Sequence, residues 1–124
     1  MRLCLFPTLE APSKAREGLA PLAERLEDDS LADLRTVISE LVTISVAHGA
    51  ADPIDVRLHV GQTELEGIVQ DGGPGARALA RSRQNLDDSL QLRIVDSLVD
   101  DWGTNPGETS VWFRMPLHPE ESGR

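Results

Sequence analysis

The sequence predicts an α/β protein, a two-layer sandwich with a mixed, mostly antiparallel sheet and helices on one face. Three observations predict this class. Apolar residues alternate with polar ones at 54–60, 65–69 and 109–115, as in half-buried strands. Apolar residues recur at helical spacing in the stretches between. Short turns rich in Gly and Pro join neighbouring strands, which makes the pairs antiparallel and leaves the helices to cover one face.

The N-terminal residues predict an edge strand and then an interrupted helix. Residues 2–6 alternate weakly and stop at Pro7. A helix starts at Pro12 and carries an apolar stripe as far as Leu26. Pro21 lacks a backbone N–H, so we expect a kink or break there.

The next segment predicts the central helix. Ser30 is typical of an N-cap, and Gly49 is typical of a helix end. Apolar residues from Leu34 to Val46 wrap most of the way round the helix. A helix with apolar residues on most sides is buried, so we expect this one at the centre of the core.

The C-terminal half predicts less regular structure. Residues 71–75 form a loop after the second strand, and residues 76–89 are polar and ambiguous. A helix is expected over 90–102, ended by Gly103. A short strand before the 105–107 turn should pair with the strand at 109–115.

Composition limits the class of function. The 124 residues fit one domain, expected over 1–116, with a flexible C-terminal tail at 117–124. The 21 acidic residues against 12 basic ones give a net charge of -9, which argues against a nucleic-acid partner. No apolar run is long enough for a membrane span, and no signal peptide is evident, so the cytoplasm is expected. The single Cys4 excludes an internal disulfide and a cysteine-based zinc site.

Three motifs carry a family resemblance. The run SELVTISVAHG at 39–49 resembles the N-box of the GHKL (Bergerat-fold) ATPases, closest to S-E-L-V-T-N-A-V-x-H-G of the bacterial anti-sigma factor and serine-protein kinase branch. DGGPG at 71–75 resembles the D-x-G-x-G adenine loop of that family. Residues 92–103 resemble the helix after the ATP lid and the strand entry beyond it, and 111–116 the closing strand. The order and spacing match from about residue 12 to 116, which implies the Bergerat fold.

The resemblance implies a general base and an adenine-binding loop. Glu40 takes the place of the N-box glutamate, which acts as general base on a substrate serine or on water. Asp71 takes the place of the aspartate that binds the adenine amino group, and Gly73 and Gly75 allow close backbone approach. Asp71 also fits a purely structural interpretation, an Asx-turn before a tight Gly-Pro turn.

Two departures weaken the implied ATP site. Ile44 stands where the family has an asparagine that ligates Mg²⁺, and isoleucine has no oxygen for that cation. Ser89 and Gln91 replace the two lid glycines whose backbone N–H groups wrap the triphosphate. No metal ligand is therefore assigned, no cofactor is certain, and any binding of ATP with Mg²⁺ is expected to be weak.

The resemblance then implies a bacterial regulator of transcription. The leading hypothesis is a protein similar to anti-sigma factor/serine-protein kinases that works mainly by protein–protein binding in a partner-switching system, as a pseudoenzyme. Its implied partners are a STAS-type anti-anti-sigma protein, a sigma factor, or a second copy of itself. One alternative is an active serine/threonine-protein kinase that phosphorylates a STAS-type protein, which Glu40 and Asp71 favour. Another is a small α/β assembly module without nucleotide.

Overall fold

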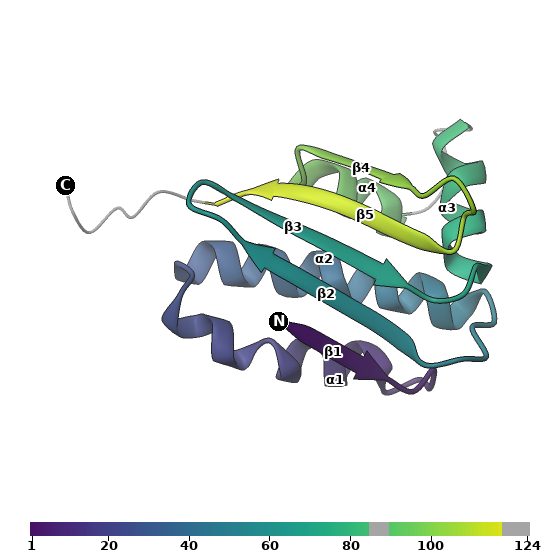
Figure 1. Cartoon of the computed structure of the whole chain (residues 1–124), viewed down its shortest axis with the longest axis horizontal. Helices are drawn as coiled ribbons and strands as arrows, with labels where there is room; N and C mark the ends of the chain where they lie inside the picture. Colours follow the sequence, from purple (N-terminus) through teal and green to yellow (C-terminus); the bar gives the residue numbers. More distant parts are fainter. Residues whose placement is uncertain (85–89, 118–124) are drawn as a thin grey trace.

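The elements follow one another in the predicted α/β order. The computed structural model describes residues 1–84 and 90–117, with the backbone alone for 82–84, 90 and 91. Its elements, drawn in Figure 1, are β1 (Arg2–Leu5), α1 (Ala11–Gly18), the 3-10 helix η1 (Ala20–Glu24), α2 (Asp28–Ala47), β2 (Ile54–Val60), β3 (Glu64–Gln70), α3 (Pro74–Gln84), α4 (Leu90–Leu98), β4 (Asp101–Thr104) and β5 (Ser110–Pro116).

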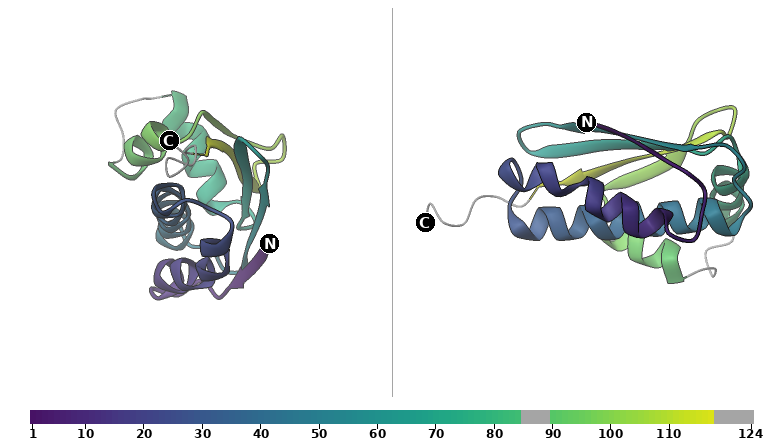
Figure 2. Two further views of the ribbon diagram at one scale, coloured as in Figure 1. Left: turned by 90° about the vertical axis from the view of Figure 1, so that its left-hand side faces the viewer. Right: turned by 90° about the horizontal axis from the view of Figure 1, so that it is seen from below.

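The sheet has five strands in the order β1-β2-β3-β5-β4, and all four pairings are antiparallel. The helices lie along one face of it, so the molecule has two layers (Figure 2). This confirms the predicted fold class. Among the described residues β1 pairs only with β2, which confirms that the first strand lies at an edge.

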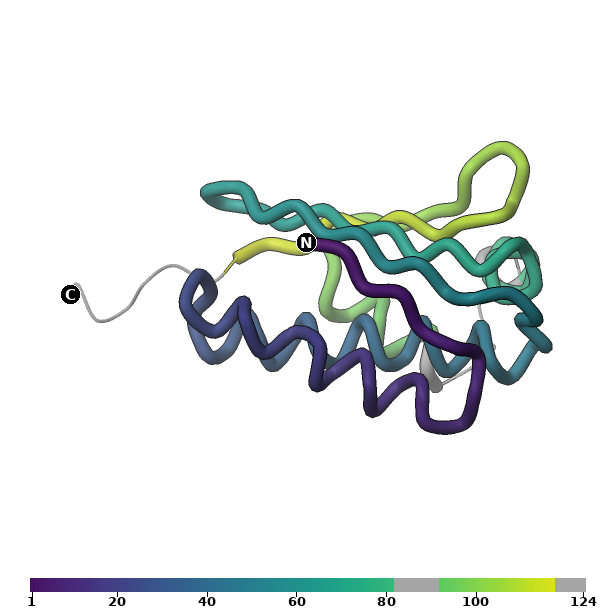
Figure 3. The backbone as a smooth tube through the Cα atoms, turned by 60° about the horizontal axis from the view of Figure 1, so that its bottom comes forward, coloured from purple at the N-terminus to yellow at the C-terminus, as the bar shows by residue number. Residues whose placement is uncertain are grey.

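The helical layer agrees with the predicted breaks but not with the predicted cap. Pro21 falls inside η1, so the first helical stretch is interrupted there as expected. α1 runs beside α2 on the same side of the sheet (Figure 3). α2 begins at Asp28 rather than at Ser30, because the chain is already helical after the extended residue Glu27. Its end was predicted correctly, since Gly49 follows with a φ of 89°.

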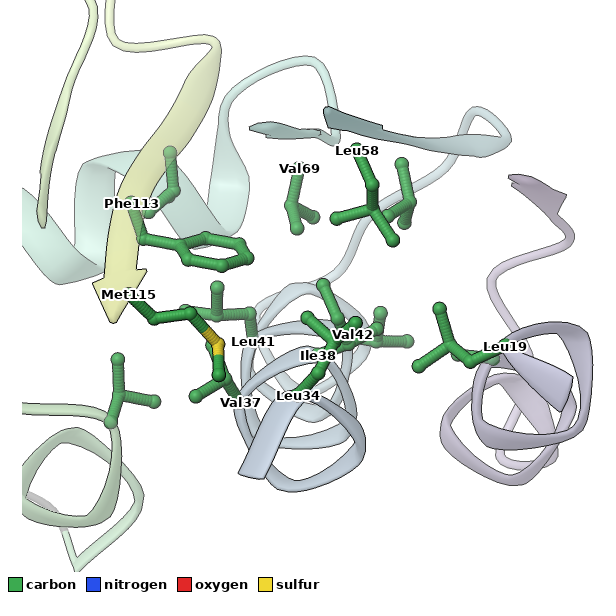
Figure 4. Packing of buried hydrophobic residues seen from close by; sticks show 14 of the residues in the cluster. Leu19, Leu34, Val37, Ile38, Leu41, Val42, Leu58, Val69, Phe113 and Met115 are labelled. Atoms are coloured by element: carbon green, nitrogen blue, oxygen red, sulfur yellow. The ribbon is translucent and has the colours of Figure 1, made fainter. Parts of the chain in front are cut away.

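The core lies between α2 and the inner face of the sheet. The labelled side chains of α2 in Figure 4 point toward those of β2, β3 and β5. Phe113 of β5 is 1% exposed, and its ring lies across the backbone of Gly67 on β3. A side chain at Gly67 would meet that ring, which explains a glycine in the middle of a strand.

Two expectations for the C-terminal half were wrong. The loop after β3 is shorter than predicted, because Pro74 and Gly75 already belong to α3, and the ambiguous stretch continues that helix to Gln84. α4 ends at Leu98, so Trp102 and Gly103 lie on β4 instead of completing a helix. Trp102 faces the core opposite Phe113, and its indole N–H donates to Asp96 Oδ1 at 3.0 Å.

The chain end adds two observations. Leu117, the first residue of the expected tail, donates its N–H to the carbonyl of Thr63 at 3.0 Å. Residues 118–124 of that expected tail lie outside the described residues.

In the described part of the chain, no helix combines the length and the apolar character that crossing a membrane requires.

Candidate functional site

The candidate site lies where β3 ends and α3 begins, at the right of Figure 1. The C-terminal half of α2 packs against this point, because Ser45 near its end lies beside Gly75. The turn between β4 and β5 closes the other side, since the Asp71 N–H donates to the carbonyl of Thr109 at 3.2 Å. The N-box residues and the 71–75 loop, which the sequence places about thirty positions apart, therefore meet at one end of the sandwich.

Asp71 holds the loop that leads into α3. Its Oδ1 accepts the Gly73 N–H at 2.8 Å, and its Oδ2 accepts the Gly75 N–H at 2.7 Å. The side chain is only 3% exposed. A carboxylate at the first turn of a helix is also stabilised by the helix dipole. Asp71 thus makes the Asx-turn that the sequence offered as its structural interpretation, and its binding to adenine stays a prediction.

The two glycines of the loop bring its backbone against other parts of the chain. A Cβ built on Gly75 would lie 2.9 Å from both Cα and Oγ of Ser45 on α2, and it would also meet Asp71 Oδ2. Gly75 is therefore needed for the loop to pack onto α2. Gly73 has a φ of 133°, a backbone conformation that residues with a side chain rarely adopt. The Arg77 guanidinium lies against Gly73.

Glu40 and Ile44 lie one helical turn apart on α2, which places them on the same side of the helix. Glu40 is partly exposed, as a group that meets a ligand must be. Ile44 is 8% exposed and belongs to the hydrophobic core. The residue next to it, Ser45, contacts the loop at Gly75, so the Ile44 turn of α2 is the one beside the candidate site.

The described side chains do not fit the Mg²⁺ site that the resemblance implies. Mg²⁺ needs oxygen ligands in near-octahedral geometry, and Ile44 offers none. Within residues 1–84 and 90–117, no group of three His, Cys, Asp or Glu side chains is placed to hold a metal ion. Glu40 is thus left without the oxygen partner that the family supplies at position 44.

The implied lid falls largely outside the description. Ser89 is not among the described residues. Gln91 lies in α4, and its side chain is likewise outside the description. The effect of these two replacements on phosphate binding therefore stays a prediction.

Two residues of the site were missed from the sequence. Ser45 matters because a small residue lets the Gly75 backbone approach, and it follows Ile44 directly in the N-box. Arg77 lies in the stretch 76–89, for which the sequence predicted no definite structure. Its position could have been inferred, because long side chains in a helix point back toward the N-terminus, and Gly73 lies four residues before it.

A separate hollow of about 570 Å³ lies at the other end of β3, between η1, the start of α2 and the β2–β3 turn. β3 is seven residues long, so roughly 20 Å separate this hollow from Asp71. The hollow is thus distinct from the candidate site, and none of the predicted site residues lines it.

Comparison with known proteins places most of the chain in one family. The family model described as a histidine kinase-like ATPase domain matches residues 6–115. No curated protein matches the chain. The matched range begins directly after β1 and includes every element from α1 to β4 and all of β5 except its last residue.

Proposed function

Because the chain belongs to the histidine kinase-like ATPase domain family, we propose that it is a regulator similar to anti-sigma factor/serine-protein kinases. It acts mainly by binding other proteins in a partner-switching system. Its ATP binding and kinase activity are weakened or lost. The observation that carries this proposal is Ile44, a nearly buried hydrocarbon side chain where an oxygen ligand for Mg²⁺ is expected.

The loss of the metal ligand bears directly on phosphoryl transfer. Such transfer depends on positioning and on a metal that neutralises charge on the phosphates. A hydrophobic side chain buried at position 44 supports neither, and it stabilises the fold instead. Asp71 adds support through its burial, because little of its side chain is open to a ligand. At this site, Ile44 therefore contributes to packing, and Asp71 fixes the loop.

The proposed partners are a STAS-type anti-anti-sigma protein, a sigma factor and a second copy of this chain. Self-association is supported by the edge strand β1, whose outer side carries no strand among the described residues. Two apolar side chains next to it are solvent-exposed, Phe6 by 77% and Leu9 by 92%. Large exposed apolar residues beside an open edge are typical of an interaction surface.

The alternative of an active serine/threonine-protein kinase is favoured by one observation. Glu40 is retained and partly exposed on the turn of α2 beside the candidate site, where a general base would be needed. This alternative requires another source of charge neutralisation for the phosphates, such as Arg77 on α3.

Calorimetric titration with ATP, in Mg²⁺ and again in EDTA, separates the two. The proposal expects binding that is weak and insensitive to Mg²⁺, whereas micromolar binding that requires Mg²⁺ would refute it. The triple variant Ile44→Asn, Ser89→Gly, Gln91→Gly should bind ATP more tightly and recover Mg²⁺ dependence. Its matched control carries only the two glycine substitutions and should remain insensitive to Mg²⁺.

Partner binding is measured directly with purified proteins. A STAS-domain protein and a sigma factor encoded near this chain would each be titrated without nucleotide. Saturable one-to-one binding of either supports the regulatory role. If neither protein binds and sedimentation shows a monomer, the result would contradict the regulatory role and favour the active serine/threonine-protein kinase.

A further inference from the structure

We propose that Arg77 is an intramolecular plug of the candidate base site: its guanidinium occupies the surface of Gly73 that a purine base would need, so nucleoside binds only when this side chain moves away. The inference rests on the proposed function, because it takes the 71–75 loop to be the adenine loop of the family. It adds a residue that controls access to that loop.

The contact between the arginine and the glycine is close and involves three atoms of the guanidinium. A Cβ placed on Gly73 would lie 2.7 Å from Cζ of Arg77 and 3.0 Å from Nη2, and it would also overlap Nη1. Three atoms of the planar group thus lie beside one side of the Gly73 backbone. Gly73 is buried, whereas its neighbour Gly72 and Arg77 itself are exposed. The exposed Arg77 side chain therefore covers the Gly73 backbone and shields it from solvent.

The geometry of α3 produces this contact. The Arg77 N–H donates to the Gly73 carbonyl at 2.8 Å, which is the first-turn hydrogen bond of the helix. A residue one turn into a helix points its side chain back toward the start, so Arg77 reaches Gly73 without any strain. A Gly at this position leaves the backbone bare, and a planar group can lie flat on it. The guanidinium shows that the surface accepts a planar group, and a purine ring is another.

The plug is held by contact rather than by charge. Within the described ranges, Arg77 takes part in no ion pair. Both Asp71 oxygens bind the Gly73 and Gly75 N–H groups instead, so they fix the loop independently of the arginine. Moving Arg77 therefore breaks no salt bridge and leaves the loop in place. The side chain can swing into solvent, and the bare Gly73 surface becomes available.

The test uses adenosine as the probe, followed by NMR on the full chain. Adenosine has no phosphates and needs no metal, so its binding is independent of Ile44 and of the lid. If the uncovered state is about a tenth of the population, removing the plug raises the apparent affinity by about tenfold. Arg77→Ala should show this gain, with the largest ligand-induced shift at the Gly73 amide. Arg77→Lys, which keeps the charge but not the planar group, should fall between the two.

Arg81→Ala is the matched control. It removes the same residue type one turn further along the exposed side of α3, away from the loop, and should bind adenosine as the wild type does. An Arg77→Ala variant that binds adenosine no better than the wild type, or more weakly, overturns the proposal. Weaker binding would identify Arg77 as a nucleoside contact instead. Thermal unfolding of each variant confirms that the fold is intact, and Arg77→Lys carries the test if the alanine variant does not fold.

The result is distinguishable from failure of the proposed function. The regulatory proposal falls if wild-type protein binds ATP tightly with Mg²⁺. The plug is judged only by the ratio of adenosine affinities between variant and wild type, with or without Mg²⁺. A protein could therefore fail one test and pass the other.

Discussion

Replacing Asp71 with asparagine should destabilise the protein strongly, although the two side chains have almost the same size and shape. Asparagine keeps one acceptor oxygen and turns the other into an NH₂ donor. The two backbone N–H groups that Asp71 now serves, those of Gly73 and Gly75, are both buried. Whichever way the amide is oriented, one of them faces a donor and loses its acceptor.

The magnitude follows from these contacts. One buried N–H left without an acceptor costs about 1–3 kcal/mol. The lost negative charge at the start of α3 costs about 0.3–1 kcal/mol more. Together these give about 1.3–4 kcal/mol. At this chain length that corresponds to a fall in Tm of about 5–16 °C.

The assay is urea unfolding followed by circular dichroism at neutral pH, with the slope m checked for constancy. Asp96→Asn is the matched control. Asp96 Oδ1 accepts the Trp102 indole N–H at 3.0 Å, and an asparagine oxygen can accept it equally well. The control should therefore change stability by no more than about 0.5 kcal/mol. If Asp71→Asn changes stability as little as the control does, the carboxylate does not hold the loop, and the assignment of Asp71 as a structural anchor is wrong.

Two further predictions concern packing and pH. Gly67→Ala should cost about 1–3 kcal/mol in urea unfolding, because the new methyl group meets the Phe113 ring. Gly107→Ala is the control, because its methyl group would make only an ordinary contact with Asn105 Nδ2 at 3.6 Å; equal effects would contradict the packing argument. The hydrogen bond from Arg2 holds the pKa of Asp55 below its ordinary value of 3.8, with smaller help from a second arginine. The stabilisation is therefore present above that pH and is lost as the pH falls through the lowered pKa. In Arg2→Gln the NMR-measured pKa of Asp55 should rise, and an unchanged titration would show that the ion pair is absent in solution.

The strands and breaks that the sequence predicted correctly share a local cause. The strands at 54–60 and 65–69 were placed within one residue, because alternation needs only a buried face and a turn at Gly61. Pro21 and Gly49 act through their own backbone, so the break and the helix end were also correct. The family resemblance followed from the same local runs, and the family match agrees with it as far as the GHKL-type ATPase domain.

The errors arose where distant partners decide the structure. Trp102 fits the apolar stripe of the preceding helix, but pairing with β5 draws it into a strand opposite Phe113. Residues 74–84 have too few apolar positions to predict a helix, yet Asp71 starts one by accepting the first N–H groups. Neither outcome could be read from periodicity, because the deciding contact lies outside the element itself.

The sequence by itself determined the two layers, the motif order and the absence of an oxygen ligand at Ile44, since each depends on residue type or on a local repeat. Only the tertiary structure decided that Ile44 is buried, that the Asp71 loop packs on Ser45, and that Arg77 covers Gly73. The physical reason is the same in each case. The type of each side chain is known from the sequence, but its neighbours depend on how α2, the loop and α3 pack together. Burial and access to a site are determined by those neighbours.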